Sequence, residues 1–208
     1  MKIAAIIPAY DEERTVGSVV ATVLSAGVAD EVIVVNDGSR DRTSEVAKAA
    51  GARVIDLPEN VGKGGAMKAG ADATDAEILL FLDADLTGLN AQHLAALVEP
   101  VVSGKAEMSI GVFDEGRFTT DMAQRITPFL SGQRAMYKWV FTSIPHIEQT
   151  RYGVEMALSR FAEKRGLRVC HVSLKHVAQI TKEEKRGFIK GFQARLRMYW
   201  EILRFSKE

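Results

Sequence analysis

The segment Glu77-Ile78-Leu79-Leu80-Phe81-Leu82-Asp83-Ala84-Asp85 joins an apolar run to two aspartates. The run Glu77–Leu82 is short, apolar and followed by polar residues, which is typical of a buried strand. Residues two apart in a strand point to the same side, so Asp83 and Asp85 are predicted to project together beyond its carboxyl end. Two adjacent carboxylates repel each other unless a cation lies close, and oxygen ligands favour Mg²⁺ or Mn²⁺. Substrate phosphates commonly fill the open positions of such ions, so the segment predicts chemistry on a phosphate-bearing donor.

Strands and helices alternate on both sides of this segment. The other expected strands are Ile3–Ile7, Glu31–Val35, Arg53–Leu57 and Glu107–Val112; the expected helices are Glu12–Ala26, Asp41–Ala50, a helix through Ala73 opened by the loop Asn60–Gly65, and Ala91–Ser103. This alternation predicts an α/β fold with a mostly parallel central sheet flanked by helices. Ligands of such sheets bind beyond the carboxyl ends of the strands.

The alternation weakens after Phe113. We interpret Gly116–Ile147 as loops and short helices on the acceptor side of the site. A helix is expected over Tyr152–Arg165, a strand over Arg168–Leu174, and a long amphipathic helix over Gly187–Phe205.

The composition excludes several classes of protein. The 208 residues include 27 Lys or Arg and 27 Asp or Glu, so the chain lacks the basic excess typical of nucleic-acid binding. A single cysteine, Cys170, excludes an intrachain disulfide and fits a reducing compartment; we interpret it as a buried strand thiol. No run approaches the roughly 18 apolar residues of a membrane span. The stretch Ile3–Ile7 is too short for a signal peptide, so we expect a cytoplasmic protein.

Polar clusters follow each of the first four expected strands. They are Tyr10 with Asp11, Asn36 with Asp37, Asn60 with Gly62, and Asp83 with Asp85. Because the carboxyl ends of parallel strands share one edge of a sheet, the four clusters are predicted to converge there.

Two nucleotide-binding fingerprints fail on this chain. A P-loop ending at Gly62-Lys63 would need a glycine where Leu57 stands, and Ser or Thr where Gly64 stands. A G-x-G-x-x-G pattern starting at Gly62 ends on Met67. A nicotinamide enzyme is therefore not expected.

The spaced motifs together resemble those of a known family. They are Pro8-Ala9-Tyr10-Asp11-Glu12-Glu13, then Val35-Asn36-Asp37-Gly38-Ser39 with Asp41 and Thr43, then Asn60-Val61-Gly62-Lys63-Gly64, and Asp83-Ala84-Asp85. In this order they resemble the nucleotide-sugar half of family 2 glycosyltransferases with the GT-A fold. Within that family the chain resembles the dolichol-phosphate mannose synthase-like and glucosyl-3-phosphoglycerate synthase-like groups. The resemblance implies one GT-A domain over 1–208, with a donor half (1–113), an acceptor-side half (114–186) and a C-terminal amphipathic helix (187–208).

The resemblance implies a set of donor-binding residues. They are Pro8, Ala9, Tyr10, Glu12, Asn36, Asp37, Gly62, Lys63, Asp83, Ala84 and Asp85. A Mg²⁺ or Mn²⁺ ion held by Asp85 and Asp83, with His176 completing its shell, would stabilise the departing nucleoside diphosphate. Simpler roles stay open: helix capping for the aspartates, turn formation for Asp37, a solvated loop position for Lys63 and a surface position for His176.

The resemblance places the acceptor in the second half of the chain. Gly132, Gln133 and Arg134 resemble the loop that follows the donor site, and Arg134 is expected to hold an acceptor phosphate. The segment Tyr152–Glu155 resembles the one that carries an acidic residue near the acceptor. Besides Asp85, Glu155 is therefore the expected catalytic residue, acting as the base of an inverting reaction. The same segment also resembles retaining glucosyl-3-phosphoglycerate synthases, and a structural role for Glu155 at a helix start stays open.

The expected C-terminal helix has an apolar side and many basic residues. It would pack on the domain or on a second subunit of a homodimer, or else rest on anionic lipid as a peripheral membrane contact.

The expected function is the metal-dependent transfer of one sugar from a nucleoside-diphosphate sugar. UDP-glucose and GDP-mannose are the expected donors, and the acceptor is a lipid phosphate, a glycolipid or a small phosphorylated molecule. Two alternatives remain: a nucleotidyltransferase, against which the acidic run Asp11-Glu12-Glu13 counts, and a non-catalytic module that binds nucleotide sugars.

Overall fold

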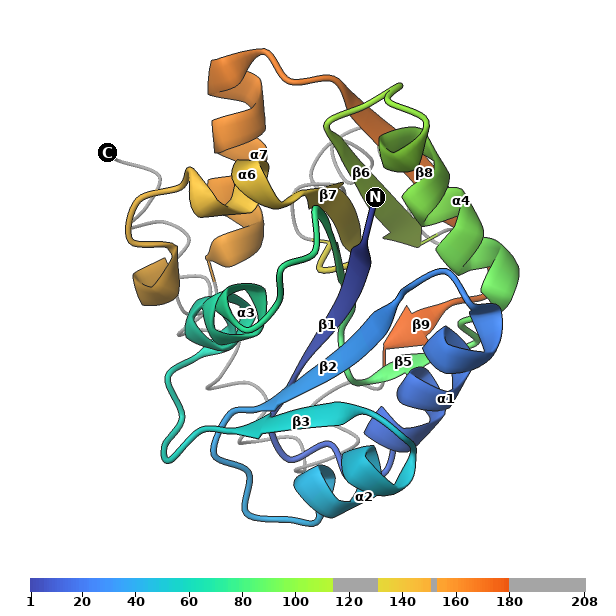
Figure 1. Cartoon of the computed structure of the whole chain (residues 1–208), viewed down its shortest axis with the longest axis vertical. Helices are drawn as coiled ribbons and strands as arrows, with labels where there is room; N and C mark the ends of the chain where they lie inside the picture. The colour runs from blue at the N-terminus through green and yellow to red at the C-terminus, as the bar shows by residue number, and fades with distance from the viewer. Residues whose placement is uncertain (114–130, 151–152, 180–208) are drawn as a thin grey trace, which may run out of the picture.

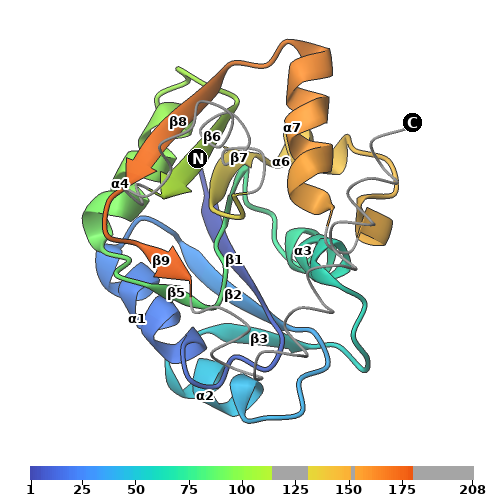
Figure 2. The ribbon, with the colours of Figure 1, turned by 180° about the vertical axis from the view of Figure 1, so that it is seen from behind.

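A computed structural model describes residues 1–113, 131–150 and 153–179 of the chain (Figures 1 and 2). The strands are β1 (Ile3–Ala9), β2 (Glu31–Asn36), β3 (Arg53–Asp56), β4 (Ile78–Phe81), β5 (Leu86–Thr87), β6 (Met108–Phe113), β7 (Arg134–Tyr137), β8 (Val169–Leu174) and β9 (Ala178–Gln179). The helices are α1 (Val16–Ala26), α2 (Thr43–Ala49), α3 (Lys63–Asp72), α4 (Ala91–Val102), α6 (Lys138–Thr142), the 3₁₀ helix η1 (Ile147–Thr150) and α7 (Val154–Arg165).

The main sheet has the strand order β3-β2-β1-β4-β7-β6-β8. Strands β1 to β4 are mutually parallel, and β6 is parallel to β8. Only β7, among the strands described, runs antiparallel within this sheet, between β4 and β6. The mostly parallel α/β architecture expected from the sequence is therefore confirmed.

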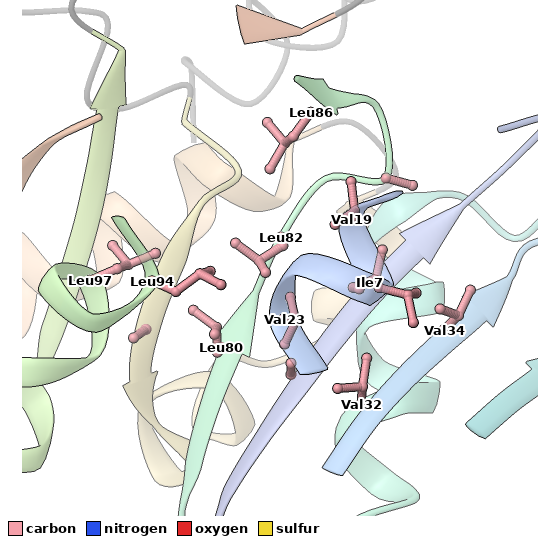
Figure 3. Close-up of a cluster of buried hydrophobic side chains, with 14 of the residues drawn as sticks. Ile7, Val19, Val23, Val32, Val34, Leu80, Leu82, Leu86, Leu94 and Leu97 are labelled. Carbon is pink, nitrogen blue, oxygen red and sulfur yellow. The ribbon is translucent and has the colours of Figure 1, made fainter. Parts of the chain in front are cut away.

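Helices cover both faces of the sheet (Figures 1 and 2). The alternation of β1 divides its side chains, with Ile7 packed on the layer of α1 and α4 and Ile6 packed on the layer of α3, α6 and α7. Figure 3 shows the first layer, where Val19 and Val23 of α1 lie over Ile7 and where Leu94 of α4 lies by Leu80. Burying each large aliphatic side chain contributes roughly 1.5–3 kcal/mol, so these two layers hold the strand ends in fixed positions.

A small ribbon lies beside the main sheet. Strand β5 pairs antiparallel with β9, with Leu86 opposite Gln179 and Thr87 opposite Ala178. Because β5 follows Asp85 directly, the ribbon brings the region after β8 back to the aspartate turn.

The structure corrects the expected course of the chain in two places, and Cys170, expected to be a buried strand thiol, is only half-buried. Helix α1 starts at Val16 rather than at Glu12, because residues 11–15 form a turn whose backbone contacts the loop after β2. Strand β7 lies within Gly116–Ile147, where loops and short helices were expected; α6 is a short helix found there, and η1 begins at its last residue. The helix expected over Gly187–Phe205 lies outside the described residues. In the part of the chain that the structure covers, no helix combines the length and apolar character needed to cross a bilayer.

Candidate active site

The loops after β1 and β2 are joined through backbone N–H groups. Asp11 adopts a positive φ of 57°, and its carboxylate accepts a hydrogen bond from Arg40 N at 2.9 Å. Its own N–H donates to Ser39 Oγ at 3.0 Å, and Glu12 N donates to Thr43 Oγ1 at 2.8 Å. These contacts fix the turn that begins at Tyr10, directly after Pro8 and Ala9 at the end of β1.

Asp37 links the second and third motifs. Its two carboxylate oxygens accept hydrogen bonds from Val61 N at 2.8 Å and from Gly62 N at 3.0 Å, and Asn60 Nδ2 donates to its carbonyl at 3.1 Å. The side chain is buried, with 3% exposed. Asp37 therefore holds the loop that leads into α3. The turn expected at Asp37 and Gly38 did not predict these hydrogen bonds.

Asn36 is held between its own loop and the next strand. Its Nδ2 donates to Asp56 Oδ1 at 2.8 Å, and its Oδ1 accepts from Ser39 N at 3.2 Å. The amide lies at the carboxyl end of β2, at the edge where the donor was expected.

Lys63, the first residue of α3, bridges the two halves of the site. Its Nζ lies 2.5 Å from Asp83 Oδ1 and 2.5 Å from Glu155 Oε1. Burial alone would lower the pKa of Lys63, but the two carboxylates outweigh it and raise the pKa above that of a free lysine. Lys63 thus stays charged and brings together the aspartate turn and the start of α7.

Asp83 is the side chain on which most of these contacts converge. Besides Lys63, its carboxylate accepts hydrogen bonds from Gln133 Nε2 at 2.8 Å and from Gln179 Nε2. A Cβ added to Gly132 would lie 2.5 Å from Lys63 Nζ and 2.6 Å from both Asp83 oxygens, so a larger residue here would force these side-chain ends to move. Strand β4 ends at Phe81, so a turn rather than strand pleating sets the direction of both aspartates.

Arg134 lies inside the protein, with 1% of its surface exposed. Its Nε donates to Ser131 O at 2.8 Å and its Nη2 donates to Ser159 Oγ at 3.0 Å. Burial lowers the pKa of Arg134 to about 10, against the opposing effect of the Glu155 and Asp83 charges, so the guanidinium keeps its proton at neutral pH. The side chain expected to meet an acceptor phosphate is thus built into the base of the site.

The remaining expected residues are placed as follows. Ala84 is buried and Asp85 is half-buried in the turn before β5. His176 is exposed. Its backbone carbonyl lies against Gly88, which follows β5, whereas Asp85 precedes β5. Tyr152 lies outside the described residues.

Gln179 is a site residue that sequence reasoning missed. A two-residue strand carries no periodic pattern, and a single glutamine has no motif spacing. Its position depends on the pairing of β9 with β5, which no signal in the sequence indicates.

The chain is similar to known glycosyltransferases over most of its length. The glucosyl-3-phosphoglycerate synthase of Mycolicibacterium paratuberculosis is 38% identical over 111 residues, which are 49% of this chain and 34% of that protein. The enzyme of Mycobacterium tuberculosis is 30% identical over 193 residues, covering 75% of this chain and 59% of that protein. The chain thus spans about a third to three-fifths of the length of these relatives.

Solved structures of the M. tuberculosis enzyme share the fold. Its complex with Mn²⁺, UDP and glucosyl-3-phosphoglycerate has a TM-score of 0.75 and 30% identity, covering 86% of this chain and 72% of that one. A further structure of that enzyme contains Mg²⁺ and UDP. The family model for glycosyl transferase family 2 matches residues 4–166, and the chain belongs to this family.

Proposed function

We propose that this chain is a metal-dependent hexosyltransferase that moves glucose from UDP-glucose to a small phosphorylated acceptor of the phosphoglycerate type. The observation that carries the proposal is the bridge from Lys63 to both Asp83 and Glu155, which joins the donor motifs to the second half of the chain. The names of the relatives support the choice of sugar donor and acceptor.

The loop before α3 and the first residue of that helix would bind the diphosphate. Asp37 fixes the backbone at Val61 and Gly62, so the helix start has one position relative to β2. Backbone N–H groups at a helix start attract anions, and Lys63 adds a full positive charge there. Asn36, at the adjacent strand end, is held by Asp56 and Ser39 N and would frame the nucleoside site.

Asp85 and Asp83 would hold the divalent ion. Their oxygens suit Mg²⁺ and Mn²⁺, and such an ion when bound neutralises the charge that develops on the departing UDP. Asp83 already accepts bonds from Lys63, Gln133 and Gln179, so its carboxylate is oriented before a ligand arrives.

Glu155 would act on the sugar or on the acceptor. Its Oε1 is bound to Lys63, so it becomes available when the donor diphosphate draws the ammonium group away. In an inverting reaction the freed carboxylate takes the proton of the acceptor hydroxyl. In a retaining reaction it orients the sugar by accepting bonds from its hydroxyls.

The test is a donor and acceptor panel with the full chain and Mn²⁺. We expect release of UDP from UDP-glucose that depends on 3-phosphoglycerate, and a product whose mass equals the acceptor plus one hexose. The anomeric configuration of the product, read by NMR, assigns inversion or retention. GDP-mannose and polyisoprenyl phosphate serve as the competing donor and acceptor.

The other classes of function give different products. A nucleotidyltransferase would form or consume pyrophosphate, and a regulatory module would bind UDP-glucose without turnover. Either result would contradict the proposed function.

A further inference from the structure

We propose that the side-chain amide of Gln179 supplies the third protein ligand of the divalent-ion site, and that His176 does not. The inference rests on the proposed function, since the ion is the one that a nucleoside-diphosphate donor requires. The proposed third ligand is an uncharged amide oxygen rather than an imidazole nitrogen.

The β5–β9 ribbon determines which residue reaches the aspartates. Leu86 lies directly after Asp85, and its partner across the ribbon is Gln179. The Gln179 amide extends from there to the carboxylate of Asp83, to which its Nε2 donates a hydrogen bond. The side chain therefore already contacts one of the two aspartates.

The same register carries His176 away from the aspartates. It precedes β9 by two residues, and its backbone carbonyl lies against Gly88, three residues beyond Asp85. Its imidazole is near enough to His93 to lower the pKa of that residue, after the larger effect of burial. In the described ranges, no three His, Cys, Asp or Glu side chains lie together as a metal-binding group, so His176 does not form one with the two aspartates.

Two glutamines contact Asp83, and their surroundings differ. Gln133 is fully buried; its Nε2 donates to Asp83 and its Oε1 accepts from Ser131 Oγ at 3.1 Å, so both ends of the amide are engaged. Gln179 is exposed, and among the described residues its Oε1 has no hydrogen-bond partner. Gln179 is thus the amide that can present its carbonyl oxygen to an ion without breaking another contact.

The ligand type has a chemical consequence. Two carboxylates and an amide form an all-oxygen set, which suits hard ions such as Mg²⁺ and Mn²⁺. An imidazole in the third position would instead favour Zn²⁺ and other later transition metals. Gln179 would therefore bias the site toward Mg²⁺ and Mn²⁺.

The test measures Mn²⁺ on the full chain with UDP and without any sugar donor or acceptor. Continuous-wave EPR of free Mn²⁺ gives the Kd, and pulsed EPR detects ¹⁴N coupling from a directly bound imidazole. We expect Gln179→Ala to raise the Kd about 10-fold. Gln92→Ala, an exposed glutamine on α4, and His176→Ala should leave it unchanged. Thermal unfolding without metal checks that each variant folds.

Gln179→His provides a spectroscopic signature. The wild-type complex should show no imidazole coupling, the Gln179→His complex should gain it, and the variant should gain Zn²⁺ affinity relative to Mg²⁺. Imidazole coupling in the wild type that disappears in His176→Ala would overturn the inference. So would an unchanged Kd in Gln179→Ala, or a wild type that binds no Mn²⁺. Since no sugar is transferred here, an inactive enzyme that still shows the expected pattern refutes the proposed function and leaves the ligand assignment standing.

Discussion

The two halves of the site hold their charged groups in different ways. In the donor half, Asp11 and Asp37 accept hydrogen bonds from backbone N–H groups of neighbouring loops. Where the proposed donor half meets the acceptor side, Lys63 pairs through its side chain with both Asp83 and Glu155, which is 92 residues away in sequence, and these three residues with Arg134 are called the acceptor-side network. Both arrangements stabilise charge, but the first depends on loop geometry and the second on the partner side chain being present.

This difference predicts how far the effect of a substitution extends through the site. A carboxylate held by the backbone keeps its place when a neighbouring side chain changes. A group held by side chains loses its partner when one of them is replaced, and a buried charge left unpaired costs several kcal/mol. Substitutions in the acceptor-side network should therefore change the stability or activity of the whole site. The following experiments test this expectation in order of decreasing effect.

Arg134→Met should cause the largest loss of stability. The variant removes the bonds to Ser131 O and Ser159 Oγ, and it removes a buried cation whose charge, like that of Lys63, interacts with Asp83 and Glu155. We expect a loss of about 3–5 kcal/mol in the free energy of unfolding, measured by urea titration. Arg42→Met, at a side chain that is 78% exposed, should cost at most about 1 kcal/mol. Equal unfolding midpoints for the two variants would contradict the expected difference between the two kinds of contact.

Asp85→Asn should abolish most of the activity without loss of stability. The change keeps the shape of a half-buried side chain but removes a charge from the proposed ion site. We expect UDP release with Mn²⁺ to fall by roughly 10²- to 10³-fold, the size seen when one charge-stabilising group is lost. Asp75→Asn, an exposed aspartate before β4, serves as the control and should retain full turnover. Normal turnover in Asp85→Asn would remove Asp85 from the ion site.

Gly132→Ala should separate activity from stability. The new Cβ would meet Lys63 Nζ and both Asp83 oxygens, so the ion pair has to shift, and we expect about a 10-fold loss of turnover. Gly104→Ala is the matched control, because its φ of 71° strains alanine while no atom lies within 4 Å of the added Cβ. It should lose about 1–2 kcal/mol of stability and keep its activity. Full turnover in Gly132→Ala would show that the pair tolerates displacement.

Most of the donor half could be predicted from the sequence because its signals are local. The strands β1 and β2 appear as apolar runs, and each is followed within two residues by polar residues of the sheet edge, whereas the Asn60–Gly62 loop follows β3 after Leu57-Pro58-Glu59. The main error there was the start of α1. Residues of that turn satisfy their N–H groups with the Ser39 and Thr43 side chains, a contact that the turn's own sequence does not contain.

The acceptor side was less predictable because its features depend on distant partners. Arg134–Tyr137 becomes strand β7 only because β4 and β6 leave a place between them. The burial of Arg134 depends on Ser159, and the role of Gln179 on the register of β9 with β5. Neither can be derived from a short motif.

Replacing Asp56 should have the smallest effect. Because Asp56 is held by side chains but lies in the donor half, it tests whether side-chain contacts alone make a site sensitive to substitution. Hydrogen bonds from Lys48 and then Asn36 lower its pKa from 3.8 to about 2. A carboxyl whose pKa is lowered on folding stabilises the fold above the unfolded value, and this contribution disappears as the pH falls from about 4 to about 2. Because the side chain is 46% exposed, the contribution should not exceed about 1 kcal/mol.

Comparing wild type with Asp56→Asn by urea unfolding between pH 7 and pH 2 measures this contribution. The wild type should be slightly more stable at pH 7, and the difference should vanish near pH 2. A difference that stays constant over this range would mean that the Asp56 charge contributes nothing. If the difference is small and closes as expected, burial rather than the use of side chains explains why the acceptor-side network is the sensitive one.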